Sequence, residues 1–331
     1  MMELTNIFPK PMRITLISLD NWGFNNHIVT SLEEKGHLVH HINFNTFTYK
    51  YPNFFYKIYN FILKAFFKTN LKTLYYGKEI IQRLNEIGET QDIILTVKGD
   101  FIDRKSILKF KQFTKKSIGF FNDNTYRCPK IIRVIPSFDE VYSFEKQDCE
   151  RYNLKFAPNW IYNSNITIHT QNSIKYEVFN IISMDQRIPI LSRIASDLVS
   201  KKINYKFIIY DKKNKGKDKN LEYISKHVPL SEVNEYINNS RVMLDINRRS
   251  QLGLTFRVFE SMGLQKKLIT TNLDIKNYDF YNPNNILIID ENKPNIPIDF
   301  FDNEYEEIPR EILEKYTLDG WVERVLLKEN T

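Results

Sequence analysis

The sequence predicts an α/β protein with two domains of similar size, each built on a parallel β-sheet. Its 331 residues are too many for one ordinary domain and fit two domains of about 150 residues. Short apolar runs alternate with helical segments in both halves, which is typical of parallel sheets covered by helices. A polar stretch rich in Asn, Ser and Thr separates the two halves.

The change in pattern along the chain gives the expected domain boundaries. A first domain is expected over residues 1–160 and a linker over residues 161–176. A second domain is expected over residues 177–316, and a final helix in residues 317–331 is expected to pack back on the first domain. Both domains are expected to be Rossmann-like, because each opens with a strand, a loop, a helix and a second strand.

In the first half, apolar runs bounded by turn residues predict six strands. These strands are expected over residues 12–19, 37–44, 91–99, 116–123, 138–144 and 154–160. Helices are expected from 26 to 35 with Gly36 as the stop, from just after Pro52, near 78–88, over 104–115, and from about Glu145.

The second half repeats the alternation with five expected strands. They cover residues 176–183, 204–210, 241–247, 266–272 and 285–290. Helices are expected over residues 187–200, 231–240, 255–263 and 317–328, and the charged run 211–220 is expected to be a solvated loop.

The composition excludes several classes of protein. Hydrophobic residues make up 42% of the chain, enough for two packed cores, so wholesale disorder is excluded. Cys128 and Cys149 are the only cysteines, and they fit neither a zinc site nor a disulfide framework. The amino terminus lacks the apolar core of a signal peptide, and no apolar run reaches the roughly 18 residues of a membrane span. We therefore expect a cytoplasmic protein that at most lies at the inner face of a membrane.

The net charge of +7 is concentrated in residues 50–78, here called the basic segment. It carries six lysines, ten aromatic residues and no acidic residue. On a helical wheel the apolar and basic side chains lie on opposite faces, made of Phe55, Tyr59, Ile62 and Phe66 and of Lys57, Lys64 and Lys68. Two interpretations stay open: a helix resting at a membrane interface, or a core-facing helix with a solvated lysine face.

Loops after the strands of the first half are candidates for a binding site, because parallel sheets bind ligands at the carboxyl ends of their strands. The loop after the first strand contains Asp20, Trp22 and Gly23, without the glycine pattern of a dinucleotide site. Segments 98–100, which begins with Lys98, and 122–124 follow two later strands. Asp123 is well placed to accept a proton from a hydroxyl nucleophile. Asp and Asn also cap helices and form turns, so a structural role stays open.

The densest group of polar residues lies between Asp245 and Asn272. A strand ends there, a loop with two arginines follows, and the next helix carries Arg257 and Glu260 one turn apart. Cations beside a helix N-terminus favour a diphosphate, and a glutamate can accept the hydroxyls of a ribose. The alternative is an ordinary ion pair on a solvated helix. The candidate donor-binding residues in this stretch are Asn247, Arg248, Gly253, Thr255, Arg257 and Glu260.

These motifs resemble a known enzyme family. The R-x-x-E pair followed by G-x-x-K-K-L-I-T-T-N resembles the donor-binding domain of GT-B glycosyltransferases, and most closely the CgeB-like group of glycosyl transferases family 1 found in lipopolysaccharide and capsule gene clusters. ILTVKGD, GFFNDN and FDEVYSFEKQDCERYNLKFAPNWIY in the first half agree with that group. The resemblance covers most of residues 12–290.

The resemblance implies a GT-B fold, with two Rossmann-like domains and their parallel sheets facing a central cleft. It implies a glycosyltransferase acting on a nucleotide-sugar donor and a lipopolysaccharide, capsule or other surface-glycan or lipid-linked acceptor. Arg257 would contact the diphosphate and Glu260 the ribose, with Arg187 as a further phosphate-binding cation. Asp123 would be the acceptor-side carboxylate, with Lys98 beside it. No metal or other cofactor is expected, because cationic side chains stabilise the leaving nucleotide.

One position departs from the family pattern. Many retaining relatives carry a glutamate eight positions before the one on this helix, where this chain has Leu252. The departure leaves the stereochemistry open, and it gives weight to the alternative of a catalytically inactive GT-B scaffold that binds nucleotide or glycan. A basic nucleic-acid-binding protein is a weaker alternative, because no helix-turn-helix, zinc-finger or RRM signature is present. A nicotinamide enzyme is the weakest, because the glycine fingerprint is absent.

Overall fold

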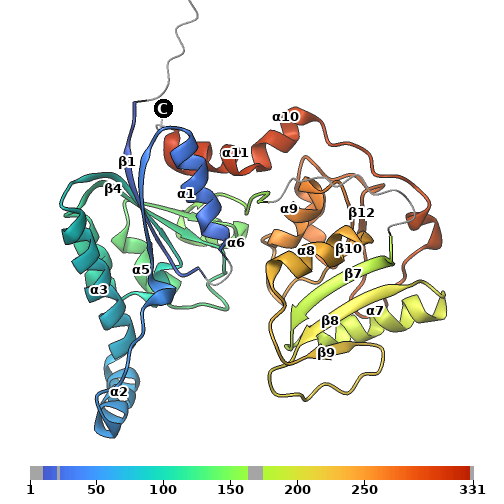
Figure 1. The fold of residues 1–331 in the computed structure, drawn as a ribbon, viewed down its shortest axis with the longest axis horizontal. Coiled ribbons are helices and arrows are strands. Elements are labelled where there is room, and N and C mark those ends of the chain that lie inside the picture. The colour runs from blue at the N-terminus through green and yellow to red at the C-terminus, as the bar shows by residue number, and fades with distance from the viewer. Residues whose placement is uncertain (1–9, 21–22, 163–173, 329–331) are drawn as a thin grey trace, which may run out of the picture. The chain divides into compact units, whose positions relative to one another are not determined.

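The computed structural model describes residues 10–20, 23–162 and 174–328 (Figure 1). The chain divides into two compact units, which are described separately below. The first unit contains Met1–Ala157 together with Val322–Thr331, and the second contains Pro158–Trp321. Each unit is built on a six-stranded sheet in which all neighbouring strands run parallel.

The sheet of the first unit has the strand order β2-β1-β3-β4-β5-β6. Its strands are β1 (Arg13–Ser18), β2 (Leu38–Asn43), β3 (Gln91–Val97), β4 (Thr114–Phe121), β5 (Glu140–Ser143) and β6 (Lys155–Phe156). The central strands β1, β3 and β4 end in almost fully buried residues, as expected for a parallel sheet covered on both faces.

The register aligns the carboxyl ends of these strands. Ser18 of β1 pairs with Asn43 of β2 and with Val97 of β3, and Val97 pairs in turn with Phe120 of β4. The loops that follow β1, β2, β3 and β4 therefore leave the sheet at one edge. This edge is called the first carboxyl edge below.

The described part of the first unit has six α-helices before its final segment. They are α1 (Phe24–Glu34), α2 (Phe54–Phe67), α3 (Leu71–Ile87), α4 (Arg104–Phe110), α5 (Ile131–Val134) and α6 (Lys146–Tyr152), with short 3₁₀ turns η1 (Phe44–Thr46), η2 (Gly99–Phe101) and η3 (Ile135–Ser137). Helices α3, α4 and α5 contribute Ile80, Ile107 and Val134 to one buried cluster with the sheet residues Ile17 and Ile94.

Helix α3 packs closely against the start of α4. A Cβ atom added to Gly77 of α3 would lie 2.2 Å from Ser106 Oγ and 2.4 Å from Asp103 Oδ2. Asp103 caps α4 by accepting a hydrogen bond from the Ser106 backbone N–H. Glycine at position 77 is therefore required by the close approach of the two helices.

The basic segment contains more helix than the sequence predicted. Helix α3 begins at Leu71, not near residue 78, because the Asn70 side chain caps it by accepting from the Lys72 backbone N–H. The expected helix 104–115 is shorter and ends at Phe110, where the chain turns into β4. The expected strand 154–160 is reduced to the two residues of the edge strand β6.

The sheet of the second unit has the order β12-β11-β10-β7-β8-β9. Its strands are β7 (Tyr176–Ser183), β8 (Tyr205–Tyr210), β9 (Glu222–Ile224), β10 (Ser240–Asp245), β11 (Lys267–Thr270) and β12 (Ile286–Ile288). Strand β9 was not predicted, because three residues are too few for a recognisable alternation. Asp245 pairs with Thr270, and Thr270 with Ile288, so the last residues of these strands share a second carboxyl edge.

The helices of the second unit enclose a core centred on β7 and β10. They are α7 (Ile188–Ser200), α8 (Leu230–Asn238), α9 (Phe256–Gly263) and α10 (Arg310–Leu313), with 3₁₀ turns η5 (Leu273–Asn277), η6 (Ile298–Phe301) and η7 (Glu314–Tyr316). Leu191, Ile194 and Leu198 of α7 are fully buried with Val178 and Val242 of the sheet.

Near the carboxyl terminus the chain passes from the second unit to the first. Helix α11 (Leu318–Val322) is followed by a π-helical turn, η8 (Glu323–Leu327). In the second unit, Trp321 packs against Trp160 with ring centroids 4.6 Å apart. In the first unit, the Tyr142 hydroxyl of β5 donates to the backbone oxygen of Arg324 at 3.3 Å. No helix within the described ranges is long and apolar enough to cross a membrane.

Candidate functional site

The loop after β1 uses its carboxylate to start helix α1. Asp20 is buried and accepts from the backbone N–H groups of Gly23 and Asn25, both at 2.8 Å. Gly23 precedes the helix with a φ of 81°, a conformation that favours glycine. Trp22, also expected on the acceptor side, lies outside the described residues. Both oxygens of Asp20 thus serve the loop itself, the structural use that the sequence left open.

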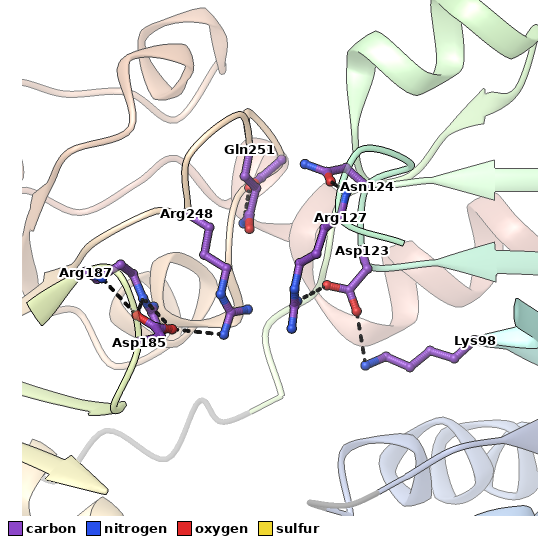
Figure 2. Close-up of polar contacts among 9 residues, drawn as sticks. Lys98, Asp123, Asn124, Arg127, Asp185, Arg187, Arg248 and Gln251 are labelled. Atoms are coloured by element: carbon purple, nitrogen blue, oxygen red, sulfur yellow. Dashed lines mark hydrogen bonds and ion pairs between the residues drawn. The ribbon is translucent and has the colours of Figure 1, made fainter. Parts of the chain in front are cut away.

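Asp123 lies between two cations at the first carboxyl edge (Figure 2). Its carboxylate pairs with Arg127 through one oxygen, and its other oxygen lies 3.4 Å from Lys98 Nζ. Lys98 follows β3 in the left-handed conformation with a φ of 61°. The Asp123 side chain is 19% exposed. The structure therefore brings the predicted Lys98 and Asp123 together and adds Arg127 to them.

Asp100 is a further carboxyl group at this edge. Its residue is 8% exposed, and burial, with a contribution from the Asp123 charge, raises the pKa of Asp100 to about 6. A carboxyl group that titrates near neutral pH is suited to general acid–base chemistry. Segment 98–100 was singled out in the sequence, but only Lys98 was retained as a candidate. The sequence signal for Asp100 was its position after a buried strand. The burial of Asp100 itself can be seen only in the tertiary structure.

The neighbouring thiol of Cys128 has a raised pKa. Burial, together with the charges of Asp123 and Asp100, raises the pKa of Cys128 to about 11. The thiolate is the reactive form of cysteine, and it is therefore scarce at neutral pH.

In the second unit, a buried carboxylate anchors the start of α9. Asp245 at the end of β10 accepts hydrogen bonds from Thr255 Oγ1 at 2.8 Å and Thr270 Oγ1 at 3.2 Å. Burial raises the pKa of Asp245, whereas these hydrogen bonds and the charges of Arg187 and Arg257 act in the opposite direction. Thr255 in turn caps α9 by accepting from the backbone N–H of Arg257. Arg187 and Arg257, 70 positions apart in sequence, therefore both lie in the electrostatic neighbourhood of Asp245.

The loop between β10 and α9 is held by its own polar side chains. Asn247 donates to the backbone oxygen of Gln251 at 3.0 Å, and it accepts from the hydroxyl of Thr271. Gln251 donates to the backbone oxygen of Gly253 at 2.9 Å. Asn247 and Gly253 thus shape the loop, and their role in donor binding stays a prediction.

Two arginines share one carboxylate at the second carboxyl edge (Figure 2). The Arg187 guanidinium binds Asp185 through Nε and NH2 and donates through NH1 to the backbone oxygen of Ile246. Arg248 NH2 lies 3.3 Å from the same carboxylate. Although burial opposes it, these hydrogen bonds and the Arg248 charge lower the pKa of Asp185. Sequence reasoning selected both arginines but missed Asp185, which orients them.

Glu260 forms a buried triad with Arg257 and Tyr162. Its residue is 2% exposed, and its two carboxylate oxygens accept from the Tyr162 hydroxyl and from Arg257 NH1. Burial and the Glu260 charge raise the pKa of Tyr162, which keeps the hydroxyl protonated as a donor. The i,i+3 ion pair expected from the alternative interpretation does form, but its Glu260 side is buried and its Arg257 side is only 18% exposed. Both carboxylate oxygens of Glu260 therefore already accept a hydrogen bond within the protein.

Two further observations concern Leu252 and metal binding. Leu252, at the position of the departure from the family pattern, uses its backbone oxygen to accept from the Asn272 side chain at 3.0 Å. Among the described residues, no group of three or more His, Cys, Asp or Glu side chains is placed to hold a metal ion.

Comparison with known proteins identifies the fold. No family model matches the sequence, and no curated protein matches it. A UDP-forming α,α-trehalose-phosphate synthase from Burkholderia xenovorans has a similar structure, with a TM-score of 0.60 and 11% identity over 95% of this chain and 98% of the synthase. MurG from Acinetobacter baumannii gives a TM-score of 0.40 and 10% identity over 80% of each chain. With its two six-stranded parallel sheets, the chain has the GT-B fold.

Proposed function

We propose that this GT-B chain is a glycosyltransferase that moves a sugar from a nucleotide-sugar donor to a surface-glycan or lipid-linked acceptor. The observation that carries the proposal is the gathering of Arg187, Arg248 and Arg257 around Asp185 and Asp245 at the second carboxyl edge. Open parallel sheets bind ligands at this edge, and guanidinium groups recognise phosphate oxygens in pairs.

The donor diphosphate would be held by Arg187 and Arg248. Asp185 orients both guanidinium groups before any ligand arrives, so the cost of ordering two long side chains is already met. Arg257 lies beside the N-terminus of α9, where the helix dipole and free N–H groups also favour negative charge. Glu260 would accept the ribose hydroxyls in exchange for the Tyr162 hydroxyl.

On the acceptor side, the proposal gives Asp123 the role of orienting or deprotonating the attacking hydroxyl if transfer inverts the anomeric centre. Asp100 is a second candidate for this proton, because its pKa of about 6 suits proton exchange near neutral pH. If transfer retains the configuration, the leaving phosphate takes the proton instead. In either case the arginines stabilise the departing diphosphate by charge, the role that a metal ion has in other enzymes, so we propose transfer without a metal ion.

The proposal is tested by thermal unfolding in the presence of UDP, GDP, ADP, dTDP and CMP, with NAD and a DNA oligomer as controls. UDP comes first because the structurally similar synthase is UDP-forming. A ligand at about 100 times its dissociation constant adds roughly 2.7 kcal/mol, which corresponds to a shift of about 5–10 °C for a unit of this size. A shift with one nucleotide that is lost in Arg187→Ala supports the donor site. No shift with any nucleotide contradicts it.

Binding alone does not distinguish an enzyme from an inactive scaffold. The nucleotide identified by the melting shift is therefore supplied as its nucleotide sugars, and release of free nucleotide is followed. Slow donor hydrolysis or transfer supports an enzyme. Tight donor binding without either reaction favours the scaffold, the alternative to which Leu252 gives weight.

A further inference from the structure

Helix α2 exposes large apolar side chains around most of its circumference. The face predicted from the helical wheel is open to solvent: Phe55 is 76% exposed, Phe66 78%, Tyr59 51% and Ile62 41%. Asn60 is the one buried residue of this helix. In Figure 1, α2 extends beyond the lower end of α3 and away from the sheet of its unit. The core-facing interpretation of the sequence is therefore wrong for this helix.

The helix is nevertheless held in a defined orientation. The Asn53 side chain caps its start by accepting from the Tyr56 backbone N–H, and Lys68 ends it in the left-handed conformation. The Asn60 side chain donates to the Tyr51 hydroxyl at 2.7 Å and accepts from the Leu71 backbone N–H at 2.8 Å. These contacts attach one side of α2 to the adjoining chain and leave the aromatic side outward.

The charge of the segment is one-sided as well. Lys57 and Lys64 are seven positions apart and lie on one face of α2, Lys68 ends this helix, and Lys72 lies in the first turn of α3. With six lysines and no acidic residue in the basic segment, the complementary surface is anionic. A second copy of this chain would bring together two segments of like charge, which disfavours self-association through this helix.

The length of α2 distinguishes a helix that spans a membrane from one that lies in the plane of its interface. Its 14 residues extend about 21 Å, and a membrane span needs about 20 residues. A short helix with a broad aromatic face and lysines on the other face matches helices that lie in the plane of the membrane interface. We propose that α2 docks on an anionic lipid bilayer, with Phe55, Ile62 and Phe66 at the acyl boundary and the lysines among the headgroups.

The docking helix projects from the same edge of its unit as the candidate acceptor residues. Strand β2 ends at Asn43, which pairs with Ser18 of β1, and Ser18 pairs in turn with Val97 of β3. From Asn43 the chain continues through η1 into α2. Lys98 and Asp123 leave the sheet at this first carboxyl edge. If the chain is the glycosyltransferase proposed above, docking of α2 brings the first carboxyl edge close to acceptors whose lipid end remains in the bilayer.

The proposal is tested by vesicle flotation of the full chain. Vesicles of phosphatidylcholine alone are compared with vesicles containing about a third phosphatidylglycerol, at two salt concentrations. We expect binding to the anionic vesicles that weakens with salt, because each lysine near an anionic surface contributes an attraction that salt screens. The triple variant Phe55→Ser/Ile62→Ser/Phe66→Ser is expected to bind at least tenfold more weakly at unchanged melting temperature, since these side chains support no core.

Charge reversal of Lys57, Lys64 and Lys68 to Glu is expected to weaken binding by at least tenfold. The matched control reverses Lys212, Lys213 and Lys217, three exposed lysines of the second unit, and is expected to change binding less than threefold. The proposal is overturned if the Lys-to-Glu variant of α2 and its control lose vesicle binding equally. It is also overturned if the wild type does not bind. Binding to DNA that the serine variant leaves unchanged, or a dimer in solution that this variant dissociates, overturns it as well.

Failure of this proposal can be told from failure of the proposed function. The serine variant should still show the nucleotide-induced melting shift, because the donor residues lie in the second unit. Vesicle binding without any nucleotide shift keeps the docking surface and refutes the glycosyltransferase. A nucleotide shift without vesicle binding keeps the glycosyltransferase and refutes the docking surface.

Discussion

Replacing Arg257 by alanine tests the buried triad of Arg257, Glu260 and Tyr162. Removing one partner of a buried ion pair typically costs 3–5 kcal/mol, because a charge stays behind without compensation. Here Glu260 is 2% exposed, but Arg257 is 18% exposed and Tyr162 still donates to the carboxylate. We therefore expect a loss near the lower limit, about 3 kcal/mol of unfolding free energy.

Urea unfolding can be followed through two buried tryptophans of the same unit, Trp160 and Trp321. With a slope of about 2 kcal/mol per molar urea, a loss of 3 kcal/mol moves the midpoint by roughly 1.5 M. The control is the double variant Arg257→Ala/Glu260→Gln, in which no charge is left buried. It should recover at least half of the loss.

The outcome separates stability from catalysis. A change below about 1 kcal/mol in Arg257→Ala, or a double variant no more stable than the single one, would refute the reasoning from burial. If the double variant is stable, its rate of donor turnover can be measured on folded protein. We expect the turnover of this double variant to be lower by about 2–4 kcal/mol in transition-state stabilisation, because it lacks the arginine that we propose contacts the diphosphate and the glutamate that we propose binds the ribose.

Three other perturbations have defined outcomes. Gly77→Ala should destabilise the first unit by about 1–3 kcal/mol in urea unfolding, because the added Cβ meets Ser106 and the helix cap Asp103. A gain in stability, as expected for alanine in an exposed helix, would contradict this packing. Asp100 has a folded pKa of about 6, above its unfolded value, so its stabilising contribution is present below pH 4 and lost as the pH rises through 6. Asp100→Asn should therefore raise the melting temperature relative to wild type at pH 8 but hardly at pH 4, and equal effects at both pH values would refute this. Arg187→Ala should weaken binding of a nucleoside diphosphate by about 10- to 100-fold in calorimetry, since one charge-assisted contact is worth about 1.5–3 kcal/mol. Binding of the nucleoside without phosphates should be unchanged. Equal weakening of both ligands would exclude a phosphate contact.

Local patterns in the sequence were enough to predict most of the framework. The strands at residues 13–18, 91–97 and 176–183 appear as apolar runs, because both faces of a parallel strand are covered. Their order along the chain predicts that the polar loops after them share one edge of a sheet. The candidates Lys98, Asp123 and Arg248 were found in this way, whereas Arg187 came from the family resemblance. The three-residue strand β9 and the early start of α3 were missed, because neither has a distinctive pattern of its own.

The partners of these residues were decided by tertiary structure alone. Asp185 meets Arg248 across 63 positions, and Glu260 meets Tyr162 across 98. The sequence likewise predicted an amphipathic helix in the basic segment but not whether a core would cover it, and the aromatic side of α2 is exposed. The reason is physical: periodicity reports the conformation of a segment and the side on which its apolar groups lie. Burial, ion pairing and pKa depend on which distant segments come to lie against that side.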